Sequence, residues 1–125
     1  MENSWLVRKL VESGLINEGQ RPLNATWASI ISESDCFLLG INPNLNNVPY
    51  YCSIYSRVDF MGPIAYSDFG IIYDISIDGQ GRLSYVGCGQ IEEDHRVITE
   101  FDDHKFFYLP APNCIDLLSK LPAYE

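Results

Sequence analysis

Between positions 36 and 109 the chain is divided into short apolar segments that are separated by clusters of turn-forming residues. The segment Tyr50–Val58 alternates in side-chain type, so that Tyr51, Ser53 and Tyr55 share one face of an extended chain and the intervening residues share the other. Segments of this length and alternation are typical of strands rather than helices. The predicted strands are Cys36–Ile41, Tyr50–Val58, Phe69–Ile77, Leu83–Cys88, Arg96–Phe101 and Lys105–Leu109.

The connections between these strands indicate how neighbouring ones pair. The tetrapeptide Asp78-Gly79-Gln80-Gly81 is rich in residues that adopt tight turns and predicts a hairpin between the strands on either side of it. The Asp102-Asp103-His104 connection predicts a second hairpin, formed by Arg96–Phe101 and Lys105–Leu109. The stretch 42–47 is dominated by Asn and Pro, which predicts a loop.

Helical periodicity is found at both ends of the chain. Near the N-terminus, Ser4 can cap a helix whose apolar residues recur every three or four positions, and Gly14 suits the left-handed position that ends it. Leu15 can then fold back onto Leu10. A second helix is predicted over Ala25–Ser32, although Ile30-Ile31 within it could equally open a strand.

The C-terminal helix is predicted from four apolar residues at helical spacing: Cys114, Leu117, Leu118 and Leu121. Asn113 is the expected N-terminal cap, and Pro122 prevents continuation. Helices at both ends with hairpins between them predict the α+β class, one antiparallel sheet with N-terminal helices and a C-terminal helix packed on one face. We expect residues 1–125 to form a single domain with one core that includes Leu10, Trp27, Leu39, Ile72, Ile75, Val86, Phe106 and Leu118.

The charge of the chain excludes several classes of partner. The formal net charge is −9, and only eight Lys and Arg residues are present, which argues against binding to nucleic acid and to anionic membrane surfaces. No apolar run approaches the roughly 20 residues that span a bilayer. The first 14 residues carry charges inside their apolar stretch, so we expect no signal peptide and a cytoplasmic protein.

The residues that most often carry chemistry form no catalytic pattern. The four cysteines lack the C-x-x-C spacing of zinc sites, so we expect buried free thiols, without disulfide, metal or cofactor. His95 and His104 lie at opposite ends of a predicted strand, about 25–30 Å apart, too far to share a metal ion. We therefore expect no enzyme; the alternative is a small hydrolase that uses His95 or His104 with a neighbouring carboxylate.

The segment Glu92–Asp103 holds six acidic residues in twelve positions. Concentrated negative charge is unfavourable for folding and is typical of a surface that attracts a basic partner. Tyrosine is a good anchor at protein interfaces because it is large, stiff and able to hydrogen-bond. We therefore expect the partner-binding residues to be Glu92, Glu93, Asp94, Glu100, Asp102, Asp103, Tyr51 and Tyr55.

The size, acidity and order of elements resemble those of bacterial toxin-immunity proteins, which pair with contact-dependent or polymorphic toxins. Within that group, Phe69–Leu121 is similar to the SUKH superfamily in four features: a hydrophobic strand, the turn Asp78–Gly81, further strands, and a C-terminal helix entered from Tyr108-Leu109-Pro110. The resemblance implies a protein without catalytic residues that neutralises a basic toxin, such as a nuclease, by occluding its active site. The alternative is a phage-encoded inhibitor, either an anti-CRISPR protein or a DNA mimic.

Overall fold

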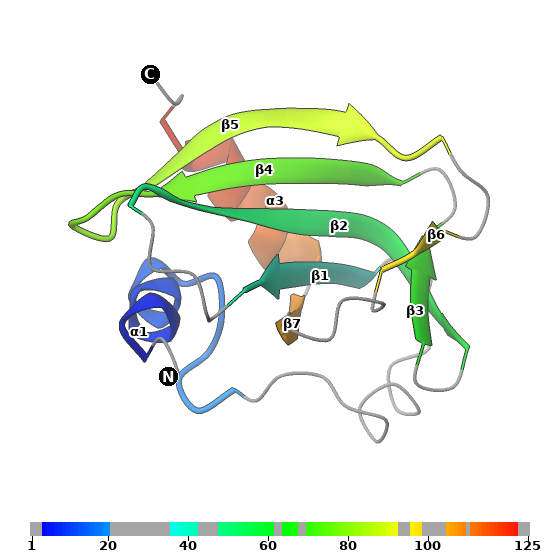
Figure 1. The fold of residues 1–125 in the computed structure, drawn as a ribbon, viewed down its shortest axis with the longest axis horizontal. Coiled ribbons are helices and arrows are strands. Elements are labelled where there is room, and N and C mark those ends of the chain that lie inside the picture. The colour runs from blue at the N-terminus through cyan, green and yellow to red at the C-terminus, as the bar shows by residue number, and fades with distance from the viewer. Residues whose placement is uncertain are drawn as a thin grey trace.

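The computed structural model describes residues 4–20, 36–42, 48–61, 64–67, 70–92, 96–98, 105–109 and 111–122. These residues form two helices and one antiparallel sheet of seven strands, which confirms the α+β class (Figure 1). The helices are α1 (Ser4–Ser13) and α3 (Ala111–Lys120). The strands are β1 (Cys36–Ile41), β2 (Tyr50–Met61), β3 (Ile64–Ser67), β4 (Ile71–Ile77), β5 (Leu83–Gln90), β6 (Arg96–Val97) and β7 (Lys105–Leu109).

The main part of the sheet has the strand order β5-β4-β2-β1-β7, and β3 and β6 extend it from the far end of β2. The predicted hairpin of β4 and β5 is confirmed. Its turn closes through the N–H of Asp78 donating to the Arg82 carbonyl at 3.0 Å, with Gly81 at φ +84°. A positive φ after a type I turn matches the right-handed twist of the two strands, and glycine adopts it without strain.

The second predicted hairpin is wrong. Strand β6 pairs with β3, through Tyr66 and Val97, whereas β7 pairs with β1, through Leu39 and Phe107. The reason lies in β7 itself, where the consecutive residues Phe106 and Phe107 are both buried. Because consecutive strand residues point to opposite faces, β7 needs cover on both faces, and its position beside β1 provides that cover.

Strand β2 is longer than predicted and bends at a β-bulge. Two residues of β2, Ser56 and Arg57, face the single residue Phe37 of β1, and Arg57 takes a positive φ of 53°. The bulge allows β2 to pair with β4 before the bend and with β3 after it. The buried side chain of Ser56 stabilises this corner, since its Oγ accepts the N–H of Ile71 at 2.7 Å.

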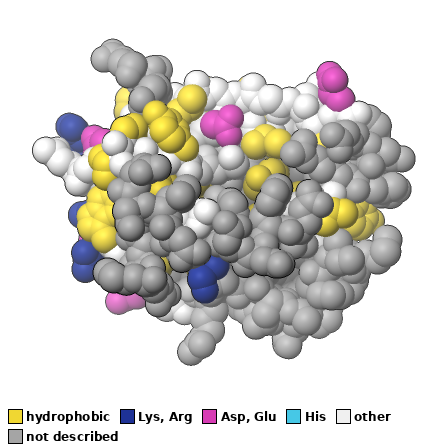
Figure 2. Space-filling model, in the orientation of Figure 1, with side chains coloured by type: hydrophobic (Ala, Val, Ile, Leu, Met, Phe, Trp, Pro, Cys, Tyr) yellow, Lys and Arg dark blue, Asp and Glu magenta, His cyan; other side chains and the backbone are white. Residues whose placement is uncertain are grey.

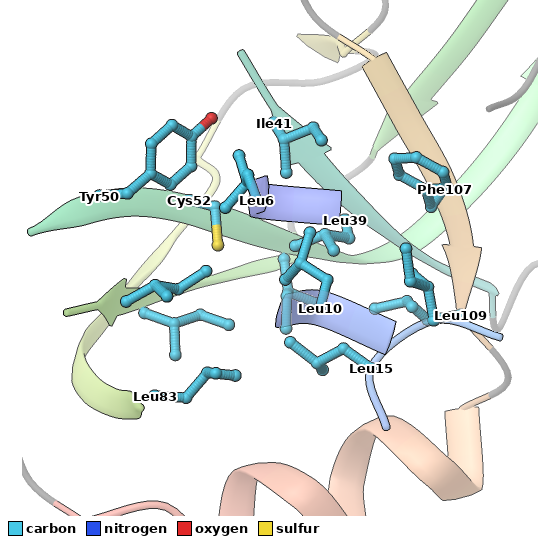
Figure 3. Close-up of a cluster of buried hydrophobic side chains, with 14 residues drawn as sticks. Leu6, Leu10, Leu15, Leu39, Ile41, Tyr50, Cys52, Leu83, Phe107 and Leu109 are labelled. Atoms are coloured by element: carbon cyan, nitrogen blue, oxygen red, sulfur yellow. The ribbon is translucent and has the colours of Figure 1, made fainter. Parts of the chain in front are cut away.

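The larger hydrophobic cluster lies between the sheet and the two helices (Figure 3). Leu6 and Leu10 of α1 are fully buried there with Leu39 and Ile75, and Leu118 of α3 packs against the cluster while half-buried. Fully burying such a side chain stabilises the fold by about 1.5–3 kcal/mol. This cluster holds both helices on one face of the sheet, as predicted.

Helix α1 ends as its sequence predicts. Gly14 has a φ of +88°, and its N–H donates to the Val11 carbonyl at 3.0 Å. The N–H of Leu15 donates to the Leu10 carbonyl at 3.2 Å, and both side chains are buried in the larger cluster. These two hydrogen bonds and the apolar contact define a Schellman motif.

Helix α3 begins at Ala111, earlier than predicted, so Asn113 lies inside the helix and is not its cap. Pro112 fits the first turn because its missing N–H would have no partner there. The helix ends before Pro122, as predicted, and the Pro122 carbonyl accepts the N–H of Tyr85 at 2.8 Å on the edge of β5.

The core differs from the prediction in two respects. A second, smaller cluster lies on the other face of the sheet, and Phe106 belongs to it together with Leu38 and Val58. Val86 is not in the core: it is 43% exposed, because β5 is an edge strand whose register with β4 shifts at this residue. Ile72 is half-buried. Trp27 and the predicted helix Ala25–Ser32 lie outside the described residues.

Candidate partner-binding surface

The structure describes three of the eight residues that were predicted to bind a partner: Tyr51, Tyr55 and Glu92. The remaining predicted residues lie outside the described ranges, as do both histidines of the hydrolase alternative: Glu93, Asp94, Glu100, Asp102, Asp103, His95 and His104. Tyr51 and Tyr55 are therefore the central described residues of the predicted surface.

Tyr51 and Tyr55 lie on the face of the sheet that points away from the larger cluster. The predicted alternation along β2 is confirmed, because Cys52 and Ile54 are buried in that cluster. Across the strand pair, Tyr51 stands opposite Ser76 and Tyr55 opposite Ile72. We call the six residues of β2 and β4 on this side the outer face: Tyr51, Ser53, Tyr55, Ile72, Asp74 and Ser76.

The two tyrosines have different environments. Tyr51 is 53% exposed, which makes it one of the most exposed large apolar side chains among the described residues. Tyr55 is half-buried and packs against Phe106, with ring centroids 6.5 Å apart and ring planes at 55°. The rings of Tyr55 and Phe106 lie close to Gly40, where a Cβ atom would be 2.9 Å from the Phe106 ring and 3.2 Å from the Tyr55 ring. Tyr55 is thus held in place, while Tyr51 is accessible to a partner.

Glu92 is exposed and lies at the same end of the sheet as Tyr55. The N–H of the preceding residue, Ile91, donates to the Gly70 carbonyl at 2.7 Å, which places Glu92 beside the beginning of β4. Strands β2 and β5 are separated by β4, so about 10 Å lies between the β2 and β5 backbones. The structure therefore brings Glu92 and Tyr55 to one end of the sheet, and Tyr51 lies toward the other end.

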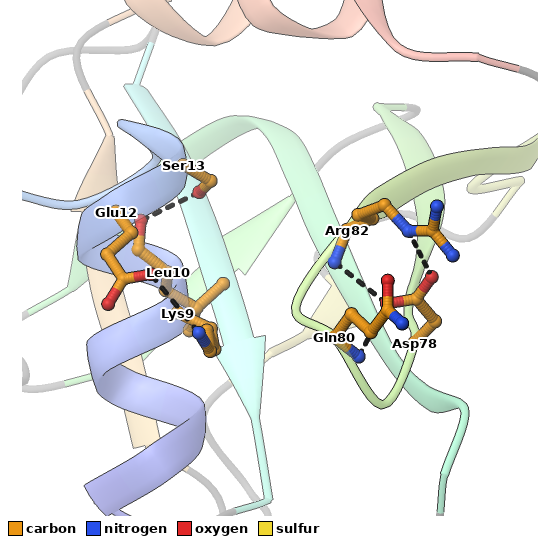
Figure 4. A network of polar contacts seen from close by, with 7 residues as sticks. All are labelled: Lys9, Leu10, Glu12, Ser13, Asp78, Gln80 and Arg82. Atoms are coloured by element: carbon orange, nitrogen blue, oxygen red, sulfur yellow. Dashed lines mark hydrogen bonds and ion pairs between the residues drawn. The ribbon is translucent and has the colours of Figure 1, made fainter.

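Asp74 is the functional candidate that the sequence prediction missed. It lies at the centre of the outer face, half-buried, and its Oδ1 accepts the hydroxyl of Ser53 at 2.9 Å. The ion pairs of the described residues are made elsewhere, between Lys9 and Glu12 and between Arg82 and Asp78 (Figure 4). The acidic side chains visible in Figure 2 stand apart from one another. The available signal was one charged residue within the apolar strand Ile71–Ile77.

The cysteines are only partly as predicted. Cys52 and Cys88 are free thiols, and the side chains of Cys36 and Cys114 are outside the described set. Burial, assisted by the nearby charge of Asp74, raises the pKa of the Cys52 thiol to about 12, so it stays protonated and unreactive. Cys88 corrects the expectation of buried thiols, since it is exposed on the edge strand β5.

Tyr50 performs a structural task. Burial raises the pKa of its hydroxyl to about 12, an effect that the hydrogen bond with the Asn42 backbone partly opposes. The hydroxyl donates to the Asn42 carbonyl at 2.9 Å and so joins the end of β1 to the beginning of β2. Within the described ranges, no group of three or more His, Cys, Asp or Glu side chains could hold a metal ion.

No protein-family model, curated protein or solved structure matches this chain. Among the described residues, no helix has the length and apolar character needed to cross a membrane. The outer face presents an exposed tyrosine, a packed tyrosine, and a half-buried carboxylate between them.

Proposed function

We propose that this chain is a cytoplasmic immunity protein, which binds a basic bacterial toxin such as a nuclease and occludes its active site. The observation that carries the proposal is the exposed Tyr51 beside Asp74 on the outer face, in a chain with a net charge of −9. The proposal requires no catalytic residue.

The charge and the tyrosine would act at different stages of binding. A strongly acidic protein attracts a basic one over a distance of about one Debye length, which raises the association rate. Tyrosine at the centre of an interface acts on the dissociation rate, and its truncation to alanine costs about 2 kcal/mol or more. Within Glu92–Asp103, the structure describes Glu92 and residues 96–98. The contribution of this acidic segment to partner binding therefore stays a prediction.

The DNA-mimic alternative receives no support from the outer face. A mimic should carry rows of carboxylates spaced like phosphates, whereas one of the six outer-face residues, Asp74, is acidic. A single carboxylate beside an exposed tyrosine suits recognition of one protein side chain better than replacement of a nucleic-acid backbone.

The test is growth of a bacterial host that expresses the toxic product of a gene adjacent to this one. The wild-type chain should restore growth, and Tyr51→Ala should weaken the purified complex about 30-fold. Ile71→Ala is the control, because it removes another exposed apolar side chain, 37% exposed, from the opposite face of β4. If no adjacent gene product is toxic, or if the wild-type chain fails to restore growth, the immunity function is wrong.

A further inference from the structure

We propose that Asp74 and Ser53, between Tyr51 and Tyr55, form a seat for one cationic side chain of the partner, an arginine in preference to a lysine. This inference rests on the proposed function, because it specifies which chemical group of a basic partner the outer face receives.

The strand register places the four side chains around one point. Tyr51 and Tyr55 are four residues apart on the same face of β2, which separates them by about 13 Å, with Ser53 midway. Asp74 stands directly opposite Ser53 on β4, at a Cβ separation of about 5 Å. The carboxylate is thus flanked by one aromatic side chain toward each end of the strands.

The electrostatics of Asp74 favour a cation at this point. An ionised carboxylate offers about four acceptor positions, and the Ser53 hydroxyl uses one of them at 2.9 Å. No cation of the described residues forms an ion pair with Asp74. Among the described residues, the group that compensates this half-buried carboxylate is the neutral hydroxyl of Ser53. Such a carboxylate gains most from a charged donor, because charge-assisted hydrogen bonds are the strong ones.

Asp74 has open space on its β5 side, whereas aromatic rings lie beyond Ser53 on the β1 side. Gly87 of β5 stands opposite Asp74, and a Cβ atom at Gly87 would have no heavy atom within 4 Å. Gly40 of β1 stands opposite Ser53 and lies under the packed rings of Tyr55 and Phe106. A side chain can therefore approach Asp74 from the β5 side and stop against the aromatic rings.

This arrangement favours arginine over lysine. The guanidinium group is planar, so it can donate two hydrogen bonds to one carboxylate and stack on an aromatic ring at the same time. A lysine ammonium acts as a compact point charge, and it is more strongly hydrated. The cation–π contribution at partly exposed sites adds to the carboxylate contact in both cases.

The test uses a hexa-arginine peptide as the probe, titrated into isotope-labelled protein and followed by amide chemical shifts. We expect shifts centred on Tyr51, Asp74 and Tyr55, and dissociation constants raised about tenfold or more by Asp74→Asn. A hexa-citrulline peptide, which is neutral and nearly isosteric, should bind at least about tenfold more weakly. A hexa-lysine peptide should fall between the two.

Two further variants keep the test decisive. Asp116→Asn removes the same charge from the exposed surface of α3 and should change the affinity less than about twofold. Gly87→Val fills the open side of the seat without altering charge, on a strand where valine is favourable, and it should weaken the peptide as Asp74→Asn does. Equal weakening by Asp116→Asn and Asp74→Asn, or full affinity in Gly87→Val, would overturn the seat.

The peptide experiment and the growth experiment separate the two proposals. If the peptide binds weakly and Asp74→Asn leaves its affinity unchanged, while the wild-type chain gives full protection, the seat is refuted and the immunity function is retained. A seat that responds to Asp74→Asn and Gly87→Val, in a chain that protects against no adjacent toxin, would refute the immunity function and retain the seat.

Discussion

Replacing Gly70 with alanine should destabilise the protein strongly, because Gly70 lies directly against the corner of the sheet at which β2 bends. A Cβ atom at Gly70 would overlap the Ser56 carbonyl oxygen and would lie 2.5 Å from Ser67 Oγ. The carbonyl belongs to the backbone of the bulge, so it cannot rotate away as a flexible side chain would. Relief of the overlap requires β2 and the beginning of β4 to separate.

The cost follows from the contacts at that corner. Overpacking a well-packed site costs about 1–3 kcal/mol. Separation would also weaken the hydrogen bond from Ser67 Oγ to the Ser56 carbonyl, 3.1 Å, and the one from the Ile71 N–H to Ser56 Oγ, each worth about 1 kcal/mol. We expect a loss of about 3 kcal/mol, a large part of the 5–15 kcal/mol that is usual for a domain. With a urea m-value of about 2 kcal/mol/M, the midpoint falls by about 1.5 M.

The assay is urea unfolding followed by far-ultraviolet circular dichroism, with Gly87→Ala as the matched control. At Gly87 the new methyl group meets nothing within 4 Å, and the substitution should stabilise the protein by about 0.4–1 kcal/mol by restricting the unfolded chain. The two glycine-to-alanine variants should therefore shift the midpoint in opposite directions. A Gly70→Ala midpoint equal to or above that of the wild type would refute the argument from close approach.

Two further predictions concern a pair of thiols and one carboxylate. Cys88 should react within minutes with a thiol reagent at pH 8, because it is exposed. Cys52 should react only after unfolding, because burial raises the pKa of its thiol to about 12. Equal reaction rates of the two thiols in the folded protein would contradict this assignment. For Asp78, hydrogen bonds from the Arg82 backbone and side chain hold the pKa of the carboxyl below its ordinary value of 3.8. The ionised carboxylate therefore stabilises the folded protein above pH 3.8, and this stabilisation is lost as the pH falls through the lower pKa of the folded state. In urea unfolding, Asp78→Asn should accordingly be less stable than the wild type at pH 7 and equally stable in strong acid. If the difference in stability does not depend on pH, the charge of Asp78 does not contribute to stability.

The pairing of the strands depends on sequence-local contacts in one hairpin and on long-range contacts in the rest of the sheet. The turn Asp78–Gly81 and the strands that it joins are neighbours in the chain, so their hairpin depends on local turn chemistry that the sequence shows directly. Strand β7 instead pairs with β1, roughly 70 residues away in the chain, through residues such as Phe107 and Leu39. Consecutive apolar residues indicate that a strand is buried on both faces, but they do not indicate which strand it pairs with.

The same distinction holds for the candidate binding surface. The alternation along β2 predicted that Tyr51 and Tyr55 share a face, since side chains of a strand alternate with a period of two. It could not predict that Tyr55 packs against Phe106 while Tyr51 stays exposed, or that Asp74 lies between them. Those facts depend on the register of neighbouring strands, which one strand's sequence does not specify.

By itself, the sequence determined the features in which residues a few positions apart act on one another. These are the Schellman end of α1 at Gly14, the glycine turn before β5, the alternation of β2, and the α+β class that follows from their order. Only the tertiary structure decided the bulge at Arg57, the exposure of Val86 and the position of Asp74 on the outer face. The physical reason is that local preferences act between residues already held near one another by the chain, whereas strand register and edge position minimise the free energy of the whole packed sheet.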